Sequence, residues 1–402
     1  MKYLVLRSLL AWFVFFACQL QSPVVAADAP ITVSVFSRLH PQSASITAAK
    51  GMVICSAGRE ETTCPELNIS WRSPRRLQCR RPDKQAASCE QVLVRPEIPG
   101  AALRIQVPGF PSREFRGTFA VSARDSALLL LNTLALEEYL YGVIGGEMAA
   151  KGEAMKCQVL VSRTYALGNM GRHRNRGYDF CDTTHCQYYR GLSGETAEIR
   201  AAIDQTRGLA LFFRGKLAKV FCHSTCGGMT NAGDTSWGGR ALPYLQPVDD
   251  GGACRFSPHY QWQAQVDAAE LLRILSAASG LQVSGFHIEK TASGGWVQTL
   301  VLNCFGKGEL LVSGEWFHLA LGRKLGWNTF KSGNFTAERS GEYWLFSGRG
   351  LGHGVGLCQF GAVQLARQGR DFRQIAQFYF PGTEIGVITN NSIFLLHLLP
   401  SR

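Results

Sequence analysis

The sequence lacks several patterns that mark common protein classes. Beyond residue 27 no apolar run is long enough to span a bilayer, which argues against an integral membrane protein. There is no internal repeat and no low-complexity tract. The glycine-rich stretch 348–356 is followed by no Gly-Lys-Ser/Thr and does not fit G-x-G-x-x-G, which excludes a nucleotide-binding loop of either kind. Strands and helices do not alternate regularly, so we predict an α+β fold and not a doubly wound sheet.

The first 27 residues have the layout of a secretory signal peptide. Lys2 and Arg7 precede an apolar run at 9–16, and small residues follow at Ala26 and Ala27. We predict cleavage near Ala27 and an exported protein of the periplasm or cell envelope, peripheral to the membrane. Cys18 leaves a lipoprotein as the alternative, although the residues before it match a lipobox poorly.

The mature chain is basic. Without Lys2 and Arg7 the formal charge falls from +12 to +10, which favours polyanionic partners. An exported protein meets cell-wall polymer, whose muramic acid carries carboxylates once its peptides are removed. We therefore predict peptidoglycan glycan strands as the partner and no nucleic acid.

Cysteine is abundant, and twelve of the thirteen cysteines lie beyond the signal peptide. An even count in an oxidising compartment predicts disulfides. One polar, Arg-rich stretch contains four of the cysteines, Cys55, Cys64, Cys79 and Cys89. Two disulfides would crosslink it. The sequence does not say which cysteine pairs with which.

Hydrophobic periodicity divides the chain into a β-rich beginning and a mixed remainder. Alternation predicts strands at 31–35, 103–107, 116–132, 297–302 and 343–346, whereas helical spacing begins at Leu136 and recurs at 153–170, 267–279 and 359–369. Asp267 is the expected cap of the 267–279 helix and Gly280 its expected end. We expect a catalytic helix packed on a β-rich body, with a smaller β-rich subdomain. The predicted domains are the signal peptide 1–27, an N-terminal β-rich, cysteine-containing region 28–115 and a catalytic domain 116–390, in which about 260–340 is a candidate insertion.

Glu147 is the candidate acid. It follows Val143 and Ile144 by four and three residues, so a helix places it on the apolar stripe. Partial desolvation there disfavours the charged carboxylate and raises its pKa toward the range of a proton donor. Gly145 and Gly146 leave room for a substrate.

Arg163 offers both a functional and a structural reading. Its guanidinium suits a sugar carboxylate or could hold a catalytic acid in place. The structural alternatives are an ordinary surface arginine, or a partner that neutralises Glu147 at the helix end.

A cysteine- and histidine-rich segment suits zinc. His173, Cys181, His185 and Cys186 supply the thiolate and imidazole ligands of a tetrahedral site. The spacing is unusual and export favours oxidation, so we place disulfides first. Candidate bridges run from this segment to Cys222 and Cys226, or onward to Cys254.

In the segment 348–356 every second residue is glycine. If extended, it has one bare face for a sugar or another backbone, while Arg349 and His353 project on the other. Tight packing of one strand on another is an equally good explanation of the glycines.

Together these segments resemble the family of stage II sporulation protein D and the amidase enhancer LytB. The matching pieces occur in the family's order and cover most of the chain from about 116 to 385. They are LNTLALEEYLYGVIGGEM (131–148), SRTYAL (162–167), CDTTHCQYYRG (181–191), FCHSTCGGMT (221–230), PYLQPV (243–248), GRGLGHGVGLCQFGA (348–362) and FYFPGTEI (378–385).

The resemblance implies a lytic transglycosylase that cleaves peptidoglycan strands stripped of their peptides, with Glu147 as the single acid/base and 1,6-anhydromuramic acid ends as product. It requires no cofactor, although some members bind zinc, which transfers to the 181–186 segment. The implied substrate contacts are Arg163, Gln187, Tyr188, His223, Ser224, Arg349, His353 and Gln359. The alternatives are a non-catalytic wall-binding activator of a cell-wall amidase, and a muramidase that uses water.

The sequence departs from the family in two places. The stretch after Glu147 and Met148 is shortened to AAKGEAMKCQ, which alters a loop beside the active site. Cys358 replaces the usual serine after the glycine-rich segment, and Cys157 replaces an alanine.

Overall fold

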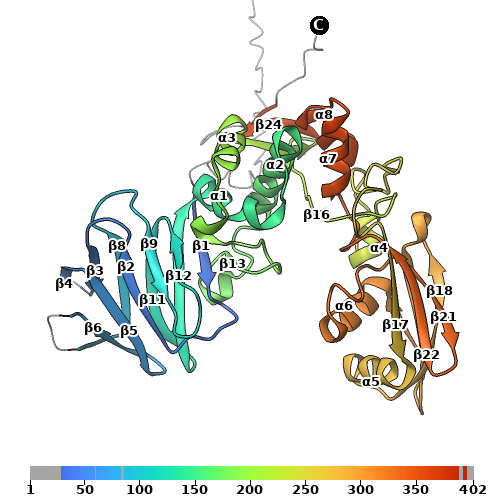
Figure 1. Ribbon diagram of the computed structural model, residues 1–402, viewed down its shortest axis with the longest axis horizontal. Helices are drawn as coiled ribbons and strands as arrows, with labels where there is room; N and C mark the ends of the chain where they lie inside the picture. The colour runs from blue at the N-terminus through green and yellow to red at the C-terminus, as the bar shows by residue number, and fades with distance from the viewer. Residues whose placement is uncertain (1–28, 59, 83–85, 389–392, 396–402) are drawn as a thin grey trace, which may run out of the picture.

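The computed structural model describes residues 29–58, 60–82, 86–388 and 393–395. The predicted signal peptide lies outside these residues. The α+β prediction is confirmed: a β-rich N-terminal part and residues 261–349 lie at opposite sides of the molecule, with helices between them (Figure 1). No described helix has both the length and the apolar character that crossing a membrane requires.

The N-terminal part consists of two sheets that share one hydrophobic core. The first has the order β13 (Phe180–Cys181), β1 (Pro30–Val35), β12 (Ala127–Ala135), β11 (Thr118–Arg124), β8 (Gln91–Pro96), β3 (Val53–Ala57) and β4 (Glu60–Cys64). The second has the order β10 (Arg113–Phe115), β9 (Leu103–Gln106), β2 (Ser43–Ala48), β5 (Glu66–Ser73), β6 (Arg76–Arg80) and β7 (Ala87–Cys89). Alternating burial along β8 and β12 explains this packing, since one face of each strand turns inward. Strands on both sides of residue 116 therefore share a sheet, and the predicted domain boundaries stay predictions.

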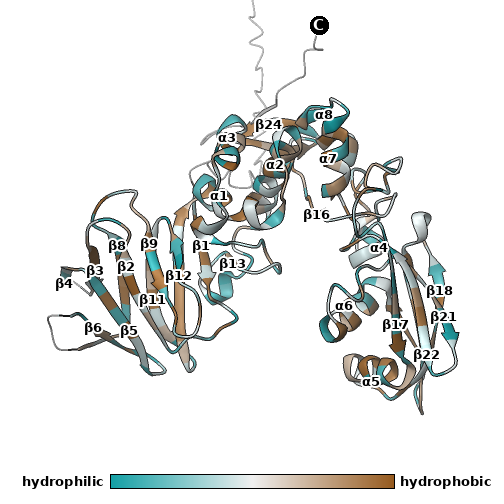
Figure 2. Cartoon of the chain, in the orientation of Figure 1, coloured by the Kyte–Doolittle hydropathy of each residue, from teal (hydrophilic) through white to brown (hydrophobic). Residues whose placement is uncertain are grey.

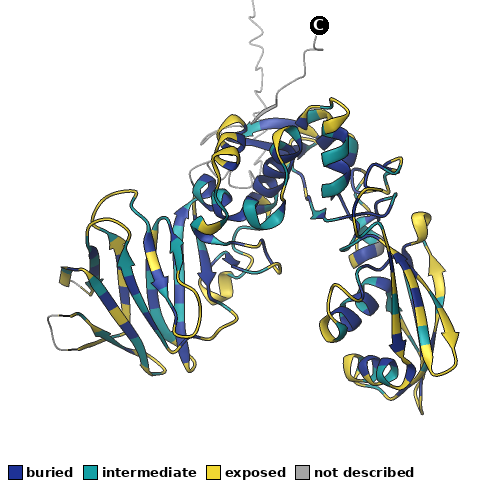
Figure 3. Cartoon of the chain, in the orientation of Figure 1, coloured by how far each residue is buried: buried dark blue, intermediate teal, exposed yellow. Residues whose placement is uncertain are grey.

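The helical part begins where β12 runs directly into α1 (Leu136–Glu147), which is followed by α2 (Gly152–Asn169) and α3 (Ala197–Gln205). Its remaining elements are β15 (Lys216–Leu217), β14 (Leu209–Phe213), β24 (Glu384–Ile388), β25 (Ile393–Leu395), β16 (Cys222–His223), β23 (Leu357–Cys358), α4 (Gly233–Trp237), α7 (Gln359–Arg367) and α8 (Phe372–Tyr379), with 3-10 turns at Arg174–Arg176 and Gly191–Gly194. Helix α2 is largely buried (Figure 3), so it forms the centre of this part. A second hydrophobic cluster surrounds it.

Residues 261–349 form a third hydrophobic cluster of their own. Two three-stranded sheets and two helices enclose it: β17 (Gln261–Asp267), β22 (Tyr343–Arg349) and β21 (Phe335–Ser340); β18 (Val283–Thr291), β19 (Val297–Cys304) and β20 (Gly308–Ser313); α5 (Ala268–Ser279) and α6 (Gly314–Leu325), with a 3-10 turn at Ser293–Gly295. Strands β18 and β21 are rich in hydrophilic residues (Figure 2), and most of their residues are exposed or half-buried. Asp267 caps α5 and Gly280 ends it in the left-handed conformation, as the sequence predicts.

Candidate active site

Glu147 is the last residue of α1, and its carboxylate is held by a neighbouring loop. Oε1 accepts a hydrogen bond from the backbone N–H of Tyr188 at 2.8 Å. Burial raises the pKa of Glu147, while the Tyr188 hydrogen bond lowers it in part. Glu147 as a whole residue is half-buried. No described basic side chain forms an ion pair with it.

The glycines before Glu147 bring α1 against the loop that carries Tyr188. A methyl group at Gly145 would collide with the backbone of Gly194, and one at Gly146 would collide with the Tyr188 carbonyl. The prediction that these glycines make room for substrate is therefore wrong. They instead allow a close approach of two backbones, which positions the Tyr188 N–H against Glu147.

Arg163 has a structural role that the sequence did not reveal. It is completely buried, and its Nε and Nη2 donate to the two carboxylate oxygens of Glu137, each at 2.8 Å. It also donates to the carbonyl oxygens of Ile203 and Leu209. Arg163 is thus neither a substrate contact nor a surface residue, nor the partner of Glu147, because its donors are all used inside the protein.

Two glutamines connect α2 and α7 to the candidate acid. Gln359 Nε2 donates to the Glu147 main-chain carbonyl at 2.9 Å and lies 3.3 Å from Gln158 Oε1. Gln158 is buried and donates to Ser162 Oγ at 3.0 Å. The Glu147 carbonyl has no helical partner at the end of α1, so Gln359 satisfies it and fixes the end of the helix. Gln158 was not singled out from the sequence, because nothing in its neighbourhood signals the pairing.

The glycine-rich segment is not a regular strand. Gly350, Gly352, Gly354 and Gly356 all have positive φ, between 74° and 102°. Side chains there would strike the backbone of Thr225, the ring of Trp296 or the carbonyl of Phe221. The segment lies beside residues 222–231 through the parallel pair β16–β23 and isolated bridges. The structural explanation of the glycines therefore accounts for their positions.

Aromatic and histidine rings form a partly exposed group beside this segment. His353 lies 5.0 Å from Trp237, 6.1 Å from Phe221 and 5.6 Å from His223, measured between ring centres. Trp237 is 45% exposed and packs on Phe221. Burial lowers the pKa of His353 to about 4 and that of His223 to about 3. Both rings are consequently neutral at pH 7. Trp237 is a further candidate contact that sequence reasoning missed.

The other predicted substrate contacts differ in accessibility. Tyr188 is 43% exposed beside Glu147, and Ser224 and Gln359 are half-buried. Gln187 is buried and exchanges hydrogen bonds with Tyr139 and the Ser162 carbonyl, so its predicted substrate contact is wrong.

Of the two remaining predicted contacts, His223 is buried and Arg349 lies in a pocket. His223 is buried with Nδ1 3.2 Å from the Val355 carbonyl, so a substrate contact would need its one remaining nitrogen, Nε2, which is buried without a hydrogen-bond partner among the described residues. Arg349 is exposed and lines a pocket together with Arg255, Ser257 and Tyr260.

The cysteine and histidine side chains predicted for zinc are brought together. Cys186 Sγ lies 3.2 Å from His173 Nε2 and 3.5 Å from both Cys181 Sγ and His185 Nδ1, and Cys181 Sγ lies 3.7 Å from His185 Nδ1. Tetrahedral zinc with ordinary bond lengths separates such ligands by roughly 3.6–3.8 Å. This set of donors therefore fits a zinc ion.

The structure separates the cysteines at 181 and 186 from those at 226 and 254, while the sulfurs of Cys226 and Cys254 lie 3.5 Å apart. Cys181 and Cys186 pack in the N-terminal core, whereas Cys226 and Cys254 pack in the second cluster. Cys79 and Cys89 approach to 3.3 Å between sulfurs, which is longer than the about 2.05 Å of a disulfide. Pairings within the N-terminal stretch stay a prediction.

Comparison with known proteins places the chain in a family. The model of the stage II sporulation protein family matches residues 124–213. This range holds Glu147 and the cluster of His173, Cys181, His185 and Cys186. Stage II sporulation protein D of Bacillus subtilis (strain 168) is 30% identical over 272 residues, covering 63% of this chain and 75% of that protein. The chain belongs to the stage II sporulation protein D family.

Other members differ in what their names state. An uncharacterized protein of Brachyspira hyodysenteriae (strain ATCC 49526 / WA1) is 27% identical over 68% of this chain and 72% of its own length. The amidase enhancer of Bacillus subtilis (strain 168) is 28% identical over 61% of this chain but only 40% of its own length. Family membership makes this a cell-wall-related protein.

Proposed function

We propose that the protein is an exported lytic transglycosylase that cleaves the N-acetylmuramic acid to N-acetylglucosamine bond of peptide-free glycan strands. The single observation that carries the proposal is the state of Glu147. It is the carboxyl group of a half-buried residue, with a pKa raised by burial and without a basic partner among the described side chains. A wall-binding module has no need of such a group.

The mechanism uses Glu147 twice. Its protonated form donates to the glycosidic oxygen, so the bond breaks and an oxocarbenium-like centre forms on the muramic acid. The resulting carboxylate then removes the proton of the muramyl C6 hydroxyl, whose oxygen closes the 1,6-anhydro ring. Glu147 regains its proton, and no water is consumed. This scheme needs one carboxyl group, whereas ordinary glycosidases use two that flank the bond.

Neighbouring groups suit a sugar chain of negative charge. Tyr188 presents an exposed ring next to Glu147. The Arg190 side chain lies against Gly146, one residue before Glu147, and is a candidate for the muramic acid carboxylate. Arg190 was not singled out from the sequence, because its position only becomes meaningful once the loop packs on α1.

We further propose a structural zinc ion held by His173, Cys181, His185 and Cys186. Such an ion would crosslink the loop that leads into Tyr188 and so support the position of its N–H. It would supply no step of the reaction, since no ligand belongs to the glycan-facing residues named above.

The second candidate is a non-catalytic activator of a cell-wall amidase. The similarity to an amidase enhancer favours it, and so does the loop between α1 and α2, which is only four residues long at 148–151. Partners would then include that amidase as well as glycan strands.

Product analysis separates the candidates. Mature protein is incubated with peptide-free glycan strands and the products are examined by mass spectrometry. We expect 1,6-anhydromuramic acid ends, which vanish in Glu147→Gln and persist in the exposed control Glu309→Gln. Reducing ends would indicate a muramidase, and intact strands would leave only the activator.

A further inference from the structure

A second cluster of metal-ligand side chains lies apart from Glu147 and from the cluster that contains His173 and His185. Cys226, Asp250, Cys254 and Cys358 are all buried, and their ligand atoms all lie within 4.8 Å of one another. The Cys226 Sγ is 3.5 Å from Cys254 Sγ and 3.1 Å from Asp250 Oδ2. Four zinc bonds of ordinary length place sulfurs about 3.8 Å apart, so the cluster needs little rearrangement.

We infer that Cys226, Asp250, Cys254 and Cys358 form a structural zinc site of three thiolates and one carboxylate. This site is separate from the histidine-containing cluster and does not depend on the proposed function. Binding releases the three thiol protons to solvent and involves no oxidation or reduction.

The composition of the cluster favours a metal over a disulfide. A disulfide would consume two of the three sulfurs and leave a buried thiol beside a buried carboxylate. No described basic side chain forms an ion pair with Asp250, and burial of an unpaired carboxylate is costly. A divalent cation offsets part of that cost, because its two positive charges lie against all four ligands.

The surroundings of the cluster support thiolate and carboxylate ligands. Cys358 Sγ accepts from the backbone N–H groups of Cys226 at 3.3 Å and Gly361 at 3.4 Å. Asp250 accepts from the N–H groups of Gly252 at 2.9 Å and Cys254 at 3.2 Å. Such donors around the ligands orient them and stabilise their negative charge.

A buried hydroxyl independently marks the same place. Tyr379 is 1% exposed, and its hydroxyl has no hydrogen-bond partner among the described residues. That oxygen and Asp250 Oδ2 both lie against the bare Cα of Gly361. A metal-bound Asp250 carboxylate would be held in place beside this hydroxyl as an acceptor.

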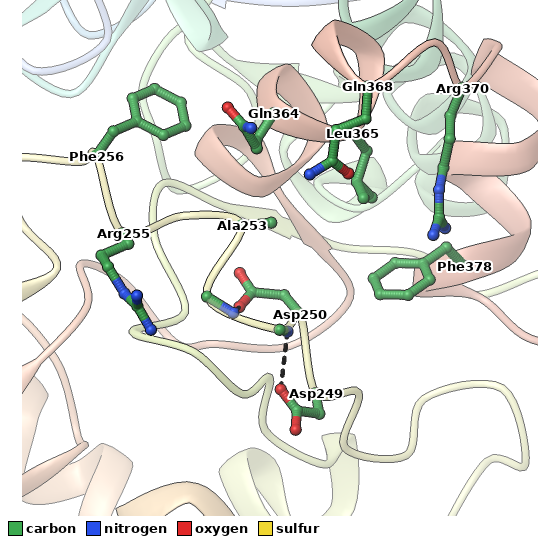
Figure 4. Close-up of a pocket in the computed structure, with 12 residues that line it drawn as sticks. Asp249, Asp250, Ala253, Arg255, Phe256, Gln364, Leu365, Gln368, Arg370 and Phe378 are labelled. Atoms are coloured by element: carbon green, nitrogen blue, oxygen red, sulfur yellow. Dashed lines mark hydrogen bonds between the residues drawn. The ribbon is translucent and has the colours of Figure 1, made fainter.

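A pocket adjoins the cluster at Asp250. Asp250 lines a pocket of 630 Å³ between residues 249–256 and the helices α7 and α8, with Gln364, Leu365 and Phe378 on its other side (Figure 4). Glu147 is not among the residues that line this pocket. The pocket therefore reaches one of the four ligands, Asp250, from a side where Glu147 does not lie.

The position of the site suggests what it stabilises. Cys226 belongs to the segment after β16, Asp250 and Cys254 to a loop, and Cys358 caps the N-terminus of α7. The next residue, Gln359, donates to the Glu147 carbonyl. The ion would join three segments distant in sequence and fix α7 beside the end of α1.

Metal content tests the inference directly. The mature full-length protein is purified from an exporting host and its zinc measured, in a Cys186→Ser background that disables the other cluster. We expect about one equivalent of zinc, lost in Cys358→Ser and in Asp250→Asn and retained in Cys304→Ser, a buried cysteine of the third hydrophobic cluster.

A measurement on the unmodified protein guards against misfolded variants. Thiol alkylation followed by peptide mass spectrometry should find Cys226, Cys254 and Cys358 reduced and protected, and reactive only after chelation. A disulfide between any two of them, or three thiols that react just as readily before chelation as after it, would overturn the inference.

Discussion

The two ends of helix α1 carry glutamates in opposite situations. Glu137, in the first turn, is 2% exposed. Arg163 donates one hydrogen bond to each of its two carboxylate oxygens, both at 2.8 Å. Glu147, at the last position, accepts one hydrogen bond from the backbone N–H of Tyr188 and forms no ion pair with a described basic side chain. The helix dipole favours an anion at the first end and disfavours one at the second. One short helix thus carries one carboxylate that is neutralised by a buried arginine and a second one that pairs with no described cation.

The largest expected effect concerns catalysis. Glu147→Gln should lower the rate of strand cleavage by roughly 10²–10⁴-fold, the usual contribution of a general acid, while the thermal unfolding midpoint is retained. The rate is measured on peptide-free strands. If the variant lost stability along with its activity, Glu147 would be a structural residue like Glu137.

The next effect concerns stability. Arg163→Met should lower the free energy of unfolding by about 3–5 kcal/mol, because Glu137 is left buried without its cation. Chemical denaturation measures it. The control Arg207→Met breaks an exposed pair with Asp204 and should cost no more than about 1 kcal/mol. Replacing Glu137 by Leu together with Arg163→Met should recover much of the loss.

A smaller effect tests the support of Glu147. Gln359→Leu removes one hydrogen bond to the Glu147 carbonyl, so kcat should fall roughly fivefold with KM unchanged. The exposed Gln368→Leu, at the other end of α7, is the matched control. A change confined to KM would instead place Gln359 in contact with the sugar.

The smallest effect is a pH dependence of stability. The raised pKa of Glu147 means that the folded protein binds this proton more tightly than the unfolded chain, so the group stabilises the fold at low pH and this stabilisation is lost as pH rises through the folded pKa. Glu147→Gln should therefore be slightly more stable than the wild type above the ordinary value of 4.5, with the difference levelling off above the raised pKa. A difference that shrinks as the pH rises would contradict the burial of Glu147.

Local patterns predicted much of the fold. The helical spacing from Leu136 gave α1 and its buried face, and Asp267 with Gly280 gave both ends of α5, since capping depends only on neighbouring residues. The alternation at 31–35 gave β1. The conformation of the 348–356 segment could not be predicted from local patterns. Its positive φ angles depend on contacts with Thr225, Trp296 and Phe221, which are distant in sequence.

The sequence by itself determined the α+β class, the family and Glu147 as the candidate acid, because helical periodicity and ordered motifs are local properties of the chain. Only the tertiary structure decided that Arg163 serves Glu137, that Gln359 supports Glu147, and that Cys358 meets Cys226, Asp250 and Cys254. These partners are separated by up to 212 positions, as between Glu147 and Gln359, and long-range packing alone brings them within bonding distance.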